Sequence, residues 1–110
     1  MIPTRLLPIT VDWLRPGVTT DAYGNTVPDW DTVTSSPLQV MIERRRTTEQ
    51  RGSRDATVTS CVMFTNELAV AATDRIVWGD DTFDVDGEPW VVHTPTGPDH
   101  AEVDLLLVVG

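Results

Sequence analysis

The sequence predicts an all-β protein, and three observations lead to this prediction. In residues 38–43 (LQVMIE) every second position is a branched aliphatic residue, and in residues 82–86 Phe83 and Val85 alternate with polar residues. This period of two is that of a β-strand with one buried face. Residues 65–73 (TNELAVAAT) contain helix formers but are too short for an independent helix, so we expect one helical turn or an irregular crossing there. The third observation is a set of turn dipeptides between the strand-like runs: Gly24-Asn25, Gly79-Asp80 and Asp86-Gly87.

The predicted strands follow one another along the chain with short connections. Pro8 and Pro16-Gly17 are expected to bound the first strand, because proline and glycine interrupt regular structure. The segments near 75–78, 82–85 and 89–93 are expected to form three consecutive antiparallel strands, since two-residue turns separate them. The complete set of predicted strands is 8–15, 30–34, 37–43, 56–64, 75–78, 82–85, 89–93 and 101–109.

The length of 110 residues predicts a single domain, residues 1–110, with one hydrophobic core. The only cysteine, Cys61, lies in an apolar run and is expected to be a buried, inert thiol. The N-terminus has no long apolar stretch, so we expect neither a secretory signal nor a membrane span, and we expect synthesis in a reducing cytoplasm.

The charge is distributed unevenly. The whole chain has a net charge of −9, but residues 44–54 (RRRTTEQRGSR) hold five arginines and Glu49, a net charge of +4, which leaves −13 on the remainder. The acidic total argues against a protein that coats nucleic acid. Residues 44–55 have no strongly apolar side chain, so we expect one long exposed loop. Two interpretations stay open for Arg44, Arg45, Arg46, Arg51 and Arg54: contact with phosphates, or a solvated surface loop.

No combination of residues predicts catalysis or a bound cofactor or metal. A calcium loop with Gly87 at its sixth position would place Thr82 first and His93 twelfth, so two ligands fail. Asp84 and Asp86 lie about 7 Å apart on one strand face, but they are expected to form the hydrated side of a hairpin rather than an acid–base pair. His93 and His100, even with Asp99 and Glu102, match no standard zinc spacing. The chain also lacks a G-x-S-x-G nucleophile motif.

The four tryptophans divide into two groups. Trp78 and Trp90 are expected in the core, because tryptophan in a small β-domain is usually buried. Trp13 and Trp30 are candidate interface residues.

The C-terminal half contains a further pattern. The stretch DRIVWGDDTFDVDGEPW, followed by a loop, VDLLLVV and the terminal Gly110, resembles the head-to-tail stopper proteins of tailed bacteriophages, also called head-closure or head–tail joining proteins. In that family this half contains an Asp-x-Val stretch, a glycine turn, an aromatic-x-Val-x-Gly-x-Pro hairpin and a last strand. The N-terminal strand, the DAYGNTVPDW turn and the polar mid-chain loop follow the same order. The matching positions are Asp74, Ile76, Gly79, Phe83, Val85, Gly87 and Pro89.

The resemblance implies a small antiparallel β-barrel that acts as a structural virion protein of the phage neck and not as an enzyme. Such subunits form a homo-oligomeric ring that closes the DNA-filled head below the portal and adaptor rings and docks the tail terminator or tail tube. A mid-chain loop projects toward the channel and helps to retain the double-stranded DNA. By position that loop is residues 44–55. Two alternatives are a tail terminator or other connector, and a small β-barrel module that binds nucleic acid or peptide.

Overall fold

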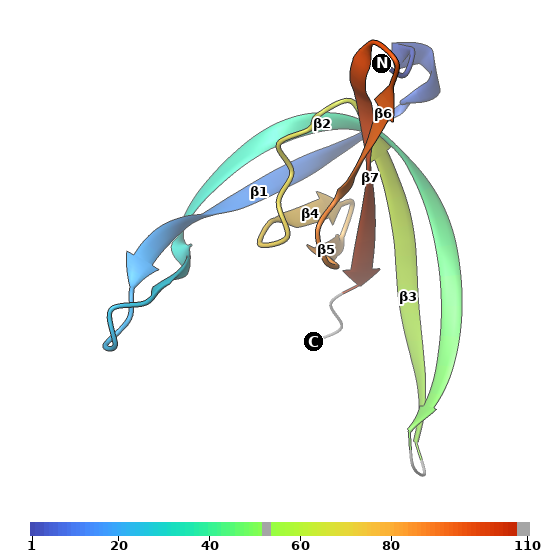
Figure 1. Cartoon of the computed structure of the whole chain (residues 1–110). Coiled ribbons are helices and arrows are strands. Elements are labelled where there is room, and N and C mark those ends of the chain that lie inside the picture. The colour runs from blue at the N-terminus through green and yellow to red at the C-terminus, as the bar shows by residue number, and fades with distance from the viewer. Residues whose placement is uncertain (52–53, 108–110) are drawn as a thin grey trace.

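The computed structural model describes the backbone of residues 1–51 and 54–107 and the side chains of residues 1–43 and 60–107. Within these residues the protein is all-β and forms one antiparallel sheet (Figure 1). A short 3₁₀ helix precedes the strands. The elements are η1 (Thr4–Leu6), β1 (Ile9–Thr20), β2 (Thr26–Arg51), β3 (Arg54–Thr65), β4 (Arg75–Trp78), β5 (Asp81–Val85), β6 (Trp90–Thr94) and β7 (Gly97–Leu107).

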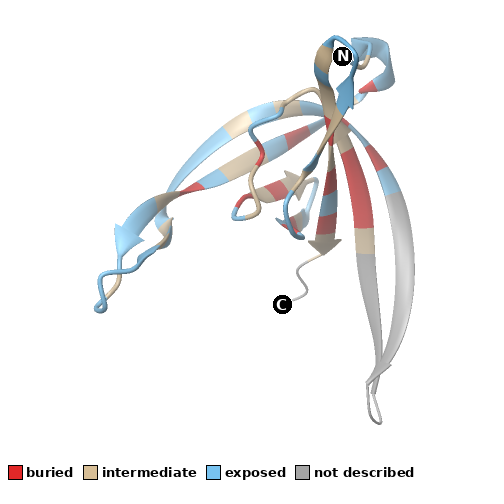
Figure 2. Cartoon of the chain, in the orientation of Figure 1, coloured by how far each residue is buried: buried red, intermediate tan, exposed pale blue. Residues whose placement is uncertain are grey.

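The order of strand pairing is circular for six of these strands. The sheet runs β3-β2-β1-β4-β5-β7, and β7 also pairs with β3. Strand β6 pairs with the first part of β7, up to Glu102, and β5 pairs with its last part, from Leu105. The core lies where these strands converge, and Figure 2 shows that the buried residues gather there. The core comprises Val11, Val40, Ile42, Cys61, Met63, Val70, Ile76, Phe83, Val85, Ala101, Val103 and Leu105.

Strand β2 is long enough to belong to two hairpins. A straight strand of 26 residues would span about 85 Å, whereas the longest dimension of the molecule is 44 Å, so β2 bends strongly. Its two ends form hairpins that diverge from the core, one with β1 and one with β3 (Figure 1). The radius of gyration is 15.7 Å, compared with about 13 Å for a compact chain of this length. We call residues 17–32 the acidic arm and residues 44–61 the basic arm.

The expected end of the first strand at Pro16-Gly17 was wrong. Strand β1 continues to Thr20, and the dipeptide marks a bulge: Pro16 pairs with Val33 while Gly17 pairs with Asp29. Proline is tolerated at such an irregularity because a ladder hydrogen bond is already missing there. The space beside Gly17 is tight, since a Cβ there would lie 3.1 Å from the Cβ of Thr32 and Thr32 would have to shift slightly. The predicted short strand at 30–34 is part of β2.

The three predicted consecutive strands are only partly correct. Strands β4 and β5 do pair, with Ile76 opposite Phe83, but β5 and β6 are not neighbours, because β7 pairs with both. Gly87 adopts a φ of 78°, so the turn forms as expected, yet the chain does not fold back onto β5. The expected core position of Trp90 was therefore wrong: its side chain is 71% exposed on β6.

The prediction that residues 44–55 form a loop was also wrong. Strands β2 and β3 continue their pairing outward from Arg44 opposite Cys61 to Arg51 opposite Arg54. A lack of apolar side chains excludes burial in a core, but it does not prevent a backbone ladder that inherits its register from the paired strands of the core.

Other predictions are confirmed. Leu38, Val40 and Ile42 turn toward the core, whereas the residues between them are exposed. The turn at Gly24 forms with a φ of 81°, and residues 66–74 cross irregularly to β4. The last strand begins earlier than expected, at Gly97, so part of the expected turn-rich segment before it is strand. Gly110 lies outside the described residues. Among the described residues, no helix has the length and apolar character needed to cross a lipid bilayer.

Candidate functional site

The basic arm has more charged residues than the acidic arm. Its sequence holds five arginines against Glu49 and Asp55, a net charge of +3. The register places Arg51 directly opposite Arg54 at the last described pair of the ladder. Like charges at opposed positions destabilise a ladder, and an anion bound near them would relieve that repulsion. The side chains of Arg44, Arg45, Arg46, Arg51 and Arg54 lie outside the described part of the structure, so their contact with DNA stays a prediction.

The acidic arm has the opposite charge. It contains Asp21, Asp29 and Asp31 and no basic residue. The Asp21 carboxylate accepts hydrogen bonds from the backbone N–H groups of Tyr23 and Asn25, each at 2.9 Å, and so fixes the turn at the tip. The hydrogen bond from Asn25, followed by that from Tyr23, lowers the pKa of Asp21, although partial desolvation opposes this. The Asp29 carboxylate accepts from the N–H of Asp31 at 3.0 Å and stabilises the bulged segment.

Trp30 connects the acidic arm to the core. It lies in the three-residue excursion of β2 opposite the Pro16/Gly17 step, and the guanidinium carbon of Arg75 sits 3.9 Å from the centre of its ring. Arg75 also donates from Nε to Asp84 at 3.2 Å. This stack holds the arm against β4 and β5. Trp30, expected as an interface residue, is half-buried within its own chain.

Asp74 is a buried carboxylate that accepts several hydrogen bonds. Its carboxylate is 2% exposed and accepts from Trp13 Nε1 at 2.8 Å, Arg15 Nη2 at 3.0 Å and the N–H of Ala71 at 2.8 Å. Arg15 also donates to the carbonyl of Ala69. The hydrogen bond to Asp74 raises the pKa of Arg15, against a smaller opposing effect of burial. Asp74 thus ties the irregular crossing to β1, and the predicted interface residue Trp13 takes part in this internal contact.

The remaining residues of the predicted hairpin motif lie in the core or in turns. Phe83 and Val85 are buried, as expected, and they pair with Leu107 and Leu105 of the last strand, a pairing that the sequence did not predict. Gly79 has a φ of 63° in the turn between β4 and β5. Pro89 is half-buried just before β6. Trp78, expected in the core, is partly buried against it.

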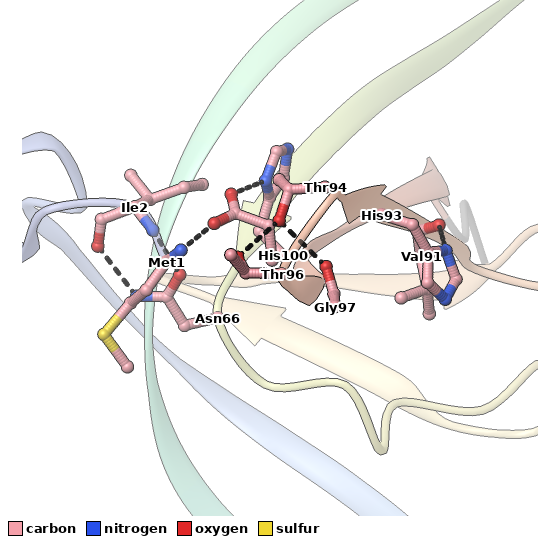
Figure 3. Close-up of polar contacts among 10 residues, drawn as sticks. Met1, Ile2, Asn66, Val91, His93, Thr94, Thr96, Gly97 and His100 are labelled. Atoms are coloured by element: carbon pink, nitrogen blue, oxygen red, sulfur yellow. Dashed lines mark hydrogen bonds and ion pairs between the residues drawn. The ribbon is translucent and has the colours of Figure 1, made fainter.

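The carboxylates and histidines weighed for chemistry do not form one cluster among the described side chains. Asp84 and Asp86 are exposed, as predicted, although Asp84 also pairs with Arg75. Figure 3 shows that His93 and His100 have separate partners: His93 Nδ1 lies 3.1 Å from the Val91 carbonyl, and His100 Nδ1 lies 2.7 Å from Asp99. Among the described side chains, no group of three or more His, Cys, Asp or Glu is arranged to hold a metal ion. Cys61 is buried in the core, as predicted.

The N-terminal segment is attached on the side of the core opposite the tips of the arms (Figure 1). Ile2 exchanges two hydrogen bonds with the side-chain amide of Asn66, at 2.7 and 2.9 Å, and the N-terminal amine pairs with Asp99 (Figure 3). Sequence reasoning did not find this attachment, because a single asparagine gives no periodic signal. It positions η1 beside β7.

Surface hollows on the described residues are small. One lies at the base of the acidic arm, has a volume of about 190 Å³ and is lined by Pro16, Gly17, Val18, Thr26, Val27, Pro28 and Thr73. Pockets for small molecules usually measure about 300–1,000 Å³, so this hollow has the size of a side chain rather than of a substrate. No protein-family model matches the chain, and no curated protein is significantly similar to it.

Proposed function

We propose that this chain is a ring subunit of the neck of a tailed bacteriophage, a head-to-tail stopper that closes the DNA-filled head and docks the tail. The single observation behind this proposal is the basic arm. A hairpin with five arginines projects from the core of a chain whose net charge is −9. An arm of this kind meets DNA at one place, while the acidic remainder prevents the protein from wrapping it.

The strand arrangement supports the same proposal. The circular pairing of six strands is compatible with a small β-barrel, the fold that the family resemblance implies. The subunits would form a closed ring below the portal and adaptor rings and above the tail terminator or tail tube. In such a ring the basic arms converge on the channel and bring their arginines to the phosphates of the packaged double-stranded DNA. The proposed function is structural and requires no catalysis and no cofactor. The protein would be synthesised in the host cytoplasm and then become part of the virion.

The arm tip is the part most suited to the DNA contact. Arg51 and Arg54 oppose one another there, and a phosphate between them neutralises two cations at once. Arg44, Arg45 and Arg46 lie at the core end of the arm. Arg46 and Arg51, the nearest members of the two groups, are five positions apart, which corresponds to about 17 Å along a strand. The two groups of arginines are therefore far enough apart to have different partners.

The experiment uses phage that carries the double substitution R51Q/R54Q. We expect heads that package DNA and then release it, with unchanged ring formation and unchanged melting temperature of the purified protein. D84N/D86N is a control that alters two exposed carboxylates on the core, and we expect it to retain DNA normally. Normal DNA retention by R51Q/R54Q heads would contradict the DNA contact. A wild-type protein that never joins the neck would contradict the proposal as a whole.

A further inference from the structure

We infer that Arg5 of one copy binds to Trp90 and Glu102 of a second copy, so that η1 of one subunit docks on the β6–β7 hairpin of its neighbour. This inference rests on the ring assembly proposed above. It names a contact by which the subunits of that ring would associate.

An arginine held by both a tryptophan and a carboxylate occurs twice within the chain. In the first group the guanidinium carbon of Arg75 lies 3.9 Å from the ring centre of Trp30, and its Nε donates to Asp84 at 3.2 Å. The negative face of the indole ring attracts the cation, and the carboxylate balances its charge. This combination of side chains therefore binds a guanidinium on the surface of this protein.

The second group lies on β1, where Arg15 is 4.9 Å from the ring centre of Trp13 and 3.0 Å from the carboxylate of Asp74. Trp90 and Glu102 form a third pair of the same kind. They are directly opposite one another in the ladder between β6 and β7, so their side chains lie on the same face of the sheet. Among the described side chains no arginine stacks on Trp90 and none pairs with Glu102, so this pair lacks its cation.

The surface beside this pair is apolar and accessible. The ladder continues the row across the sheet, from Glu102 to Phe64 of β3 and from Phe64 to Met41 of β2. Trp90 is 71% exposed and Met41 is 42% exposed. Large apolar side chains that lie together on the surface are typical of a site that meets another protein. A partner that fits this row brings both a cation and an apolar side chain.

Arg5 on η1 has these properties. Its side chain is exposed, and it forms no ion pair or cation–π contact with the described side chains, whereas Arg15 and Arg75 are both engaged. Its neighbour Leu6 is 53% exposed. A guanidinium is weakly hydrated and stacks readily on an indole ring, so it can be buried against Trp90 at lower cost than an ammonium.

The two surfaces lie at the same end of the molecule. Asn66 and Asp99 hold the N-terminal segment beside the start of β7, and the β6–β7 hairpin extends toward this end, away from the tips of the arms (Figure 1). A rotation about an axis along this direction therefore brings η1 of one copy level with the hairpin of the next. Because the contact joins two different surfaces, it is head-to-tail and closes into a ring when the rotation allows it. Arg5 takes no part in the proposed DNA contact.

The test is a charge exchange, measured by sedimentation velocity of the full chain at low salt over a range of protein concentrations. R5E alone and E102R alone should each raise the dissociation constant of the oligomer at least about tenfold, because like charges at an interface are strongly unfavourable. The two variants change the net charge in opposite directions, so total charge cannot explain a loss in both. The matched control is D80R, which reverses an exposed charge in the turn between β4 and β5 and should assemble as the wild type does.

Restoring the charge pair should restore the assembly. An equimolar mixture of R5E and E102R places opposite charges at every contact between unlike copies and should associate as the wild type does. A contact within one chain could not be restored by mixing. The double variant R5E/E102R should also assemble.

Trp90→Ala tests the ring separately from the charge. It should raise the dissociation constant about threefold or more, while the midpoint of urea unfolding stays nearly unchanged because the side chain is 71% exposed. Arg5→Lys keeps the charge but loses the planar guanidinium, so its dissociation constant should lie between those of the wild type and R5E. A purely structural role of Trp90 would instead lower the unfolding midpoint.

A cysteine pair covers a wild type that associates weakly. Under mild oxidation, a mixture of R5C and E102C should form a dimer with a disulfide between positions 5 and 102, identified by peptide mass mapping. Its yield should be well above that of dimers from either variant alone, and the native Cys61 is buried. Absence of this disulfide, or normal assembly of R5E and E102R, would overturn the Arg5 contact and leave the neck function in place. Assembly weakened by E102R but not by R5E would assign the site to another arginine and would overturn it too. The disulfide in a protein that never joins the neck would keep the contact and remove the neck function.

Discussion

The guanidinium of Arg15 on β1 lies 3.0 Å from the carboxylate of Asp74, which directly precedes β4. The two residues are 59 positions apart, and their contact connects the first strand to the end of the irregular crossing. Trp13 donates to the same carboxylate, and Arg15 also lies over the ring of Trp13, 4.9 Å from its centre. This cluster fixes the crossing that leads from β3 to the short hairpin of β4 and β5.

Replacing Asp74 with asparagine should destabilise the fold. The amide retains an acceptor but removes the charge that faces Arg15, and it leaves at least one buried donor without a partner, which costs about 1–3 kcal/mol. Unfolding in urea, followed by tryptophan fluorescence, measures the loss. The matched control is Asp84→Asn, which disrupts a half-exposed ion pair with Arg75 and should cost about 0–1 kcal/mol. Equal losses for the two variants would refute the anchoring role of Asp74.

Phe83 and Trp90 provide a direct comparison of two aromatic residues. Phe83 is 1% exposed in the core, so Phe83→Ala should cost about 3–5 kcal/mol. Trp90 is 71% exposed, so Trp90→Ala should change the free energy of unfolding by only about 0.5 kcal/mol. Denaturant melts of the two variants measure both free energies of unfolding and so test whether Trp90 on β6 is exposed. A large loss on replacing Trp90 would show that it is buried in the folded chain.

The turn of the acidic arm should respond to acid. The lowered pKa of Asp21 means that the ionised carboxylate is favoured in the folded turn. Its contribution to turn stability is therefore present above the ordinary aspartate pKa of 3.8 and is lost as the pH falls through the lower, folded-state value. An NMR titration of the Tyr23 and Asn25 amide protons should show a midpoint below 3.8. In Asp21→Asn the same amides should show no titration in this range, and a wild-type midpoint above 3.8 would oppose the assigned hydrogen bonds.

If the proposed function is correct, the affinity of the protein for double-stranded DNA should depend on salt through the tip of the basic arm. Each phosphate contact that is removed lowers the slope of log K against log salt by about 0.9. We expect R51Q/R54Q to reduce the slope measured by fluorescence anisotropy with a short duplex. Arg5→Gln, which removes an exposed arginine in η1, should leave the slope unchanged. A slope that falls only with Arg5→Gln would move the DNA contact away from the basic arm.

Local alternation was sufficient to predict much of the sheet. The period of two around Val40 and Phe83 identified both their strands and their buried faces, because one face of each strand is core and the other is exposed. The same local information failed where distant partners decide the structure. Nothing near Asp86-Gly87 reveals that β7 takes the place beside β5, since the partners of Phe83 and Val85 in β7 are Leu107 and Leu105, 24 and 20 positions away.

The charge of the basic arm could be predicted from the sequence, but its structure as a paired hairpin could not. The arginines stood out in the sequence, yet their extension as a hairpin depends on the register set by Val40–Ile42 and Met63–Thr65 in the paired strands of the core. The acidic arm escaped notice for a related reason. Pro16-Gly17 has the composition of a strand end, and only the structure shows that the strand continues and that Thr32 approaches Gly17 closely.

One feature of β2 has a mechanical consequence. Because Thr26–Arg51 is a single strand, the same backbone passes from one arm through the core into the other, and it changes partner at Val40, which pairs with Ile9 of β1 and with Thr65 of β3. A pull on either arm along the strand would load many hydrogen bonds of the ladder in parallel rather than one at a time. Tension applied to either arm would thus be shared by many strand pairs before any single pair opens.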